Sequence, residues 1–194
     1  MIWFAGALAL SVAAALSFLI ARARAIKGRH LRMFGAGVPP LDPDAERLVD
    51  APRALYHGTR FADGQRVLAP SLGEACVADL FCTGQALFLR REQAGPEGGK
   101  LIALPLAWVF DASLHRAHAP LAGKELPMLR VRWKRGGEEL VSEVSLRGGM
   151  AQLERLRREI HLRQPEALER LRRFLEAQPV PGAGAGPDAP GTPR

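Results

Sequence analysis

The sequence predicts a mainly β domain with an α-helical C-terminal part, preceded by a hydrophobic helix. Three observations lead to this fold class. The first 21 residues contain no charged side chain, and five basic residues follow them closely. Apolar and polar residues alternate between positions 128 and 146, which is the period of a half-buried strand. Between positions 149 and 177, apolar residues recur every three to four positions, as in a helix packed on one side.

Residues 1–21 have the length and composition of a membrane-spanning helix. About 20 apolar residues cross a hydrocarbon core of about 30 Å, because a helix rises about 1.5 Å per residue. A cleaved signal peptide would carry its positive charge before the apolar run, whereas here the charge follows it. We therefore favour a retained transmembrane anchor over a cleaved signal peptide.

The basic residues after this segment predict its orientation, because basic flanks stay on the cytoplasmic side of a membrane. These membrane-flanking residues are Arg22, Arg24, Lys27, Arg29 and Arg32. We expect a single-pass protein of the inner (plasma) membrane, with the amino terminus outside and the domain in the cytoplasm. The bilayer is then its first expected partner.

The rest of the chain divides by composition into four segments. Residues 22–53 combine the basic cluster with a linker rich in proline and glycine. Residues 54–163 are predicted to form a β-domain with a closing helix, and residues 164–178 an extra helix. Residues 179–194 are rich in proline and glycine, so they cannot build a core and we expect them to be disordered.

Short strands separated by turn residues account for the first part of the β-domain. We expect strands over 54–60, 74–83 and 86–92, with turns between them. The apolar run 101–110 contains Pro105, which cannot donate to a strand ladder, so one strand ends near it and another begins. Such short connections favour an antiparallel sandwich or open barrel.

A β-hairpin is the clearest local structure. Its turn is Gly136-Gly137, because glycine accepts the positive φ angles of a tight turn. One expected face of the first strand holds Leu129, Val131 and Trp133, and the other holds Arg130, Arg132 and Lys134. We expect the outward basic residues to pair with Glu139 and Glu143 on the return strand.

Two apolar stripes are expected in the helical part. Leu153, Leu156 and Ile160 form the first stripe, which we expect to be buried against the sheets. Pro165 suits the first turn of a new helix, so a second helix is predicted to begin there. Its stripe comprises Leu168, Leu171, Phe174 and Leu175.

Charge and cysteine content restrict the function classes. The net charge is +7, from 27 basic and 20 acidic residues, and the segment 22–32 supplies five of these positive charges. Because this basicity is concentrated in a flank and aromatic residues are only 6% of the chain, we expect no nucleic-acid partner. Cys76 and Cys82 lie six residues apart in an expected strand, which is too far for a disulfide, so we predict free thiols.

Residues that could hold a metal or a cofactor are sparse. His115 and His118 have a metal-like spacing only in a helix, and their context is strand or loop, so a surface pair is favoured. The sequence contains no phosphate-binding glycine loop, metalloprotease motif or serine-nucleophile motif. We therefore predict no metal, no cofactor and no catalytic residues.

A family resemblance is carried by the order of these motifs. A strand ending in Asp79-Leu80-Phe81-Cys82-Thr83 is followed by a turn, by 86–91, by 101–106, by the hairpin and by one closing helix. This order resembles bacterial pleckstrin-homology-like and GRAM-like β-domains over residues 54–163. The resemblance implies two packed antiparallel sheets, a helix plugging one open end, and a binding or scaffolding role with a protein or lipid partner. Phosphoinositide binding is not implied, because the loop 62–65 has only Arg60 and Arg66 at its edges.

A second resemblance provides the alternative function. Tyr56-His57-Gly58-Thr59 is similar to the first motif of ADP-ribosyltransferase-like domains. This resemblance implies that His57 binds the nicotinamide ribose of NAD and that Gly58 lets the backbone approach the ligand. Phe88 would then supply the aromatic residue of that family, and Glu139 or Glu143 the catalytic acid. We favour the binding domain and keep this NAD-dependent enzyme as the alternative.

Overall fold

A computed structural model describes residues 2–35, 38–68, 70–92, 99, 101–119 and 123–177. Its helices are α1 (Ile2–Gly35), the short α2 (Pro70–Gly73) and α3 (Gly149–Ala177), with a 3-10 turn, η1, at Leu106–Trp108. Its strands are β1 (Val49–Phe61), β2 (Cys76–Cys82), β3 (Ala86–Arg91), β4 (Leu101–Pro105), β5 (Val109–Ala119), β6 (Lys124–Arg135) and β7 (Glu138–Ser145). The predicted tail 179–194 lies outside the described residues.

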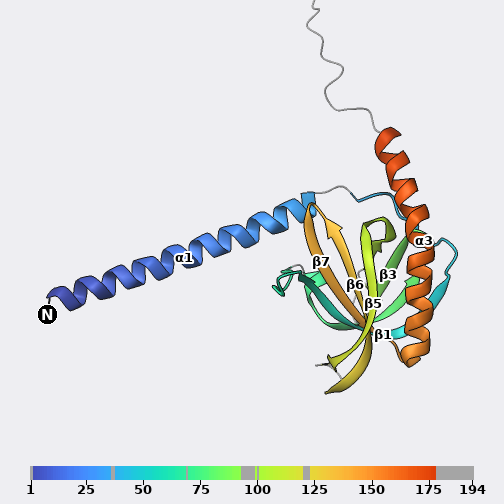
Figure 1. Cartoon of the computed structure of the whole chain (residues 1–194), viewed down its shortest axis with the longest axis horizontal. Helices are drawn as coiled ribbons and strands as arrows, with labels where there is room; N and C mark the ends of the chain where they lie inside the picture. The colour runs from blue at the N-terminus through green and yellow to red at the C-terminus, as the bar shows by residue number, and fades with distance from the viewer. Residues whose placement is uncertain are drawn as a thin grey trace, which may run out of the picture.

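All seven strands belong to one antiparallel sheet with the order β4-β3-β2-β1-β7-β6-β5. The antiparallel β-domain is thus confirmed, although its strands form a single sheet where two were expected. The long strand β1 joins both halves, because it pairs with β2 from Val49 to Tyr56 and with β7 from Leu55 to Phe61. The sheet curls around its core (Figure 1).

The predicted strand pattern is largely confirmed. The run 101–110 does break at Pro105, and the hairpin does turn at Gly136-Gly137, where both φ angles are positive. The inward residues Leu129, Val131 and Trp133 are buried. Strand β1 starts at Val49, earlier than the expected position 54, so the end of the predicted linker is part of the sheet.

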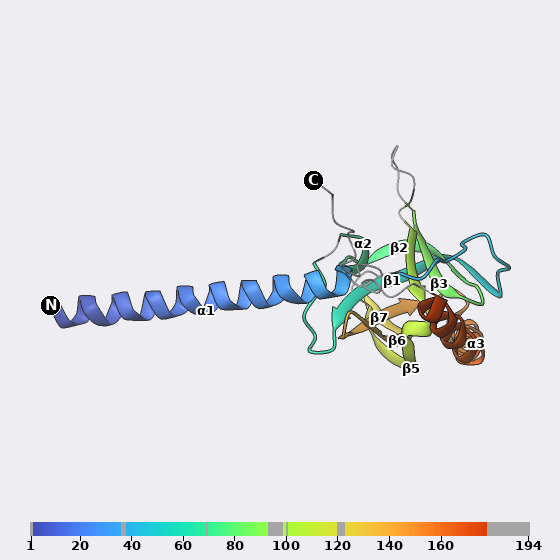
Figure 2. The ribbon, with the colours of Figure 1, turned by 90° about the horizontal axis from the view of Figure 1, so that it is seen from above.

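The C-terminal helix α3 lies along the curled sheet (Figures 1 and 2) and packs on η1, β5 and β6. Leu153, Leu156 and Ile160 are fully buried, which confirms the first apolar stripe. The helix continues through Pro165, so the predicted start of a second helix there is wrong. Leu168 of the second stripe is 45% exposed.

The N-terminal helix α1 continues beyond the apolar segment to Gly35 and projects from the β-domain (Figures 1 and 2). No helix in the described part of the chain combines the length and apolar composition that a membrane crossing requires. This finding contradicts the predicted transmembrane segment 1–21 and the single-pass location in the inner membrane that depended on it.

The last turns of α1 dock onto the β-domain. Met33 is fully buried in the core, and the backbone of Arg32 packs so closely on Gly136 that a Cβ there would lie 2.1 Å from the Arg32 carbonyl oxygen. Arg29 Nε donates a hydrogen bond of 2.9 Å to Glu138 and also pairs with Asp63. Arg32 Nη2 lies 2.6 Å from the same Glu138 carboxylate. Part of the predicted juxtamembrane segment is therefore a fixed element of the domain.

Candidate functional site

The Tyr56-His57-Gly58-Thr59 motif lies in the middle of β1, and two of its side chains point into the core. The Tyr56 hydroxyl donates to the Leu72 carbonyl oxygen at 2.7 Å and also bonds Thr59. Thr59 Oγ1 lies 2.7 Å from Ser142 Oγ, which accepts a 3.0 Å hydrogen bond from Trp133 Nε1. Burial raises the pKa of Tyr56 far above its ordinary value. This network satisfies polar groups inside the sheet, which is a structural role.

Gly58 occupies a bulge in β1 and is needed there for a close contact within the chain. Its φ angle is +88°, and the pairing with β7 shifts register between Tyr56 and Thr59. A Cβ at this position would lie 2.8 Å from the Gly73 carbonyl oxygen. The space that a glycine leaves open for a ligand in the NAD-binding motif is thus filled by the protein's own backbone.

His57 points to the opposite, outer face of the sheet and is only 8% exposed. Its Nε2 lies 2.9 Å from Ser145 Oγ, whereas its buried Nδ1 has no hydrogen-bond partner among the described residues. Burial lowers the pKa of His57, the Glu143 carboxylate opposes this effect, and Arg60 adds to it. The imidazole is therefore neutral at neutral pH.

A groove of about 340 Å³ lies beside this histidine, between β1, β2, β6 and the junction of β7 with α3. We call it the basic groove. Its rim carries Arg53, Lys124 and Arg147, its lining includes Ser145, and its remaining lining residues are the apolar Leu55, Val77, Leu126 and Leu146. Lys124 and Arg147 are exposed, and neither has an ion-pair partner among the described residues.

The backbone at Arg53 is held in an unusual conformation that places this residue at the groove. Its φ angle is +54°, in a region that side chains with a Cβ rarely adopt. The pairing of β1 with β2 shifts register between Ala51 and Ala54, and the Arg53 amide donates to Asp79 Oδ1 at 3.1 Å. The Arg53 guanidinium has one weak ion pair, 3.7 Å from Glu92, and its side chain is 57% exposed.

A second hollow on the outer face differs from the basic groove in its charge balance. It is lined by Arg60, Arg130, Arg132, Glu139 and Glu143, among others. Arg130 pairs with Glu143 at 3.0 Å, and Arg132 pairs with Glu139. These cross-strand pairs confirm the predicted pairing of the outward Arg residues with Glu139 and Glu143. Two of the three cations in this hollow are therefore neutralised by carboxylates from β7.

The other residues of the NAD-dependent alternative do not form one site. Phe88 is stacked on Phe81 in a separate buried cluster on β3, and β2 lies between that strand and β1. Glu139 and Glu143 are held by arginines, and Glu143 also lies 3.2 Å from His115 Nε2. Of the candidate acids, only Glu143 acts electrostatically on His57.

The remaining predicted residues are placed as follows. His115 and His118 lie three positions apart on β5, so their side chains leave opposite faces of the strand. Among the described residues, no three His, Cys, Asp or Glu side chains cluster in a way that could hold a metal.

Cys76 and Cys82 are free, as predicted, and burial raises the pKa of Cys82 to about 12. Of the five basic residues on α1, Arg29 and Arg32 form ion pairs with the β-domain.

The basic groove is the site that sequence reasoning missed. Arg53 lies within β1, Lys124 begins β6 and Arg147 follows β7, so these residues are far apart in the chain and no spacing signals that they meet. The comparisons with known proteins add no further assignment. No protein-family model matches the sequence, and no curated protein matches it.

Proposed function

We propose that this chain is a non-catalytic binding protein, whose pleckstrin-homology-like β-domain receives a ligand or partner on the outer face of its sheet. The observation that carries this proposal is that the Tyr56-His57-Gly58-Thr59 motif is engaged in contacts within the fold. Tyr56 and Thr59 are hydrogen-bonded inside the core, and Gly58 packs on the Gly73 carbonyl. The motif therefore serves to bend and stabilise β1.

The filled interior of the sheet supports a binding role on its outer face. Apolar side chains of the sheet and α3 fill the core, and the two hollows described above are lined mostly by residues outside it. The basic groove has the size typical of small-ligand sites and combines apolar lining residues with a few polar groups. Fold alone does not define a function, so the argument depends on this groove and on the motif.

The proposal is tested by incubating the full chain with NAD and measuring nicotinamide release. We expect no release above that of a buffer blank, in the parent chain and in His57→Gln alike. His118→Gln is the matched control, because it changes an exposed histidine on the same sheet. Circular dichroism and the melting temperature establish that each variant is folded.

One result would contradict the binding proposal. If the parent chain and His118→Gln release nicotinamide and a folded His57→Gln does not, the NAD-dependent alternative holds. NAD also carries phosphates, so turnover and not mere stabilisation by NAD is the deciding measurement.

A further inference from the structure

We propose that the basic groove binds a phosphate group carried on a small apolar body. This inference rests on the proposed binding function and names the chemical class of the ligand. It follows from three features of the groove: positive charge with little compensation, a buried hydroxyl that can donate a hydrogen bond, and an apolar floor.

The positive charge of the groove has little compensation. Arg53, Lys124 and Arg147 meet there, and the only ion pair that any of them makes among the described residues is the 3.7 Å contact of Arg53 with Glu92. In the second hollow, by contrast, Arg130 and Arg132 are paired with carboxylates. Three cations at one site favour a dianionic phosphate over a single carboxylate, because each can add a charge-assisted hydrogen bond.

The hydrogen-bonding state of His57 leaves the Ser145 hydroxyl able to donate. His57 Nδ1 is buried without a partner among the described residues, and an unpaired N–H costs more than an unpaired lone pair. The favoured tautomer therefore carries its proton on Nε2 and donates to Ser145 Oγ, 2.9 Å away. The Ser145 hydrogen is then available to a ligand oxygen.

The remaining surface of the groove suits the non-phosphate part of a ligand. Leu55 and Val77 come from neighbouring strands, and Leu126 and Leu146 face them from β6 and from the end of β7. Apolar atoms of a ligand gain favourable free energy when these side chains remove them from water. The same phosphate chemistry occurs in soluble organic phosphates and in phospholipid headgroups, so the experiment must separate these two sources.

The test is isothermal titration of the full chain with three probes, and the two lipids among them are used below their critical micelle concentrations. Glycerol 3-phosphate offers the phosphate alone, dihexanoyl phosphatidic acid adds apolar chains, and dihexanoyl phosphatidylcholine has the same chains without net negative charge. We expect phosphatidic acid to bind more tightly than glycerol 3-phosphate, and phosphatidylcholine not to bind. Tight binding of glycerol 3-phosphate would support the groove with a soluble phosphate as the source.

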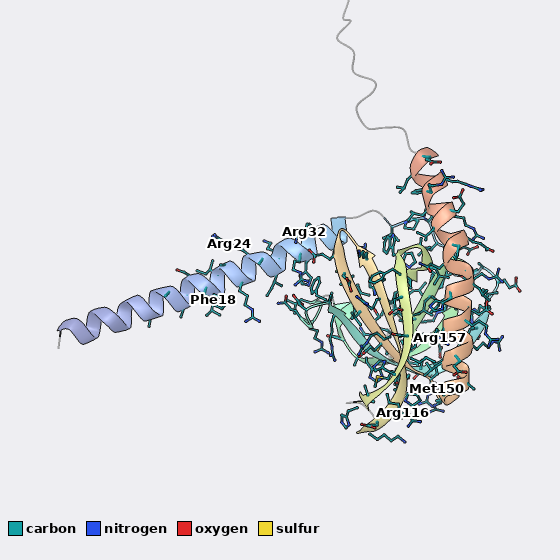
Figure 3. All side chains as sticks on the ribbon, viewed as in Figure 1. Phe18, Arg24, Arg32, Arg116, Met150 and Arg157 are labelled. Carbon is teal, nitrogen blue, oxygen red and sulfur yellow. The ribbon has the colours of Figure 1, made fainter. Side chains whose placement is uncertain are left out.

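The decisive variant is Lys124→Gln/Arg147→Gln, which removes two exposed cations from the groove. Its matched control is Arg24→Gln/Lys27→Gln, which removes the same two charge types from the exposed surface of α1, far from the groove. Figure 3 places Arg24 on the projecting helix, whereas Arg116 and Met150 mark the end of the domain where β6 and α3 begin. We expect the groove variant to lose about tenfold or more in affinity, and the control to stay within about twofold of the parent.

Two results would overturn the inference. One is the absence of binding by both phosphate probes at millimolar concentration. The other is an equal loss of affinity in the groove variant and in the α1 control, which would indicate attraction by net charge alone. Neither result bears on nicotinamide release, so failure of this inference is distinguishable from failure of the proposed function.

Discussion

The two long helices are attached to the β-domain by different forces. α3 is attached by apolar side chains, because Leu153, Leu156 and Ile160 are fully buried against the sheet and η1. α1 is attached over its last turns only, by Met33 and by two arginines that share the Glu138 carboxylate. Apolar burial has no preferred direction, whereas paired arginines fix an orientation. The difference indicates that α3 completes the core and that α1 is oriented by an ionic clamp.

The exposure of side chains along the two helices also differs. In α1 the described side chains Leu16, Phe18 and Leu19 are each more than half exposed, and burial begins only near its C-terminal end. In α3 burial is greatest in the first half, and Leu175 near its end is 58% exposed. α1 is thus part of the domain only over its last turns, whereas α3 is part of the domain from Leu153 to Ala167.

Truncation of the α3 stripe is the largest expected effect. Leu156→Ala should lower the free energy of unfolding by about 2–5 kcal/mol, because it removes buried atoms and leaves a cavity. Leu168→Ala is the matched control on the exposed side of the same helix and should cost less than about 1 kcal/mol. Urea unfolding of the full chain measures both values. Equal and small losses would mean that α3 does not close the core.

Removal of the clamp carboxylate is the next largest effect. Glu138→Gln should destabilise the docked end of α1 by about 1–2 kcal/mol, because Arg29 and Arg32 lose a shared partner whose side chain is only 14% exposed. Hydrogen exchange should quicken over residues 26–33 and stay unchanged over residues 153–160. Glu125→Gln, an exposed residue of β6, is the control. If exchange in α1 is unaffected, the contacts of Met33 and His30 and the Arg29–Asp63 pair hold the helix without Glu138.

Acidification is expected to have the smallest effect, and this effect is selective for the docked end of α1. Hydrogen bonds from Arg32 and then Arg29 hold the pKa of Glu138 below its ordinary value of 4.5. The Gln65 amide and then Arg29 lower the pKa of Asp63 likewise. A carboxyl with a lowered pKa stabilises the docked state above its ordinary pKa, and this stabilisation is lost as the pH falls through the lowered value.

Exchange protection of the docked end of α1 should therefore fall below about pH 4.5, before that of residues 153–160 in α3. Hydrogen exchange at a series of pH values, corrected for the intrinsic rate, measures this difference. In Glu138→Gln the acid response should shrink to the part that Asp63 supplies. Parallel loss of protection in both helices would show that acid acts on the whole fold and not on the clamp.

Much of the fold could be predicted because its signals are local. The alternation of Leu129, Val131 and Trp133 with basic residues fixes the faces of β6, and Gly136-Gly137 fixes the turn. Pro105 marks the end of β4, and the spacing of Leu153, Leu156 and Ile160 marks the buried face of α3. The break expected at Pro165 was wrong, because a proline within a long packed helix need not end it.

The candidate site could not be predicted in the same way. His57 drew attention through a four-residue motif, but the motif's polar groups are used inside the core and its glycine packs on Gly73. The meeting of Arg53 with Lys124 and Arg147 depends on strand pairings between distant segments. The periodicity of apolar residues within one segment does not reveal its pairing with a distant segment.

The sequence by itself determined the strand and helix periods, the hairpin, the break at Pro105 and the free state of the two cysteines, because each depends on neighbouring residues. Only the tertiary structure decided that β1 joins both halves of one sheet, that α1 docks through Arg29 and Arg32, and that three cations meet beside Ser145. The physical reason is that these features arise from long-range pairing and packing, where side chains from distant segments share one surface.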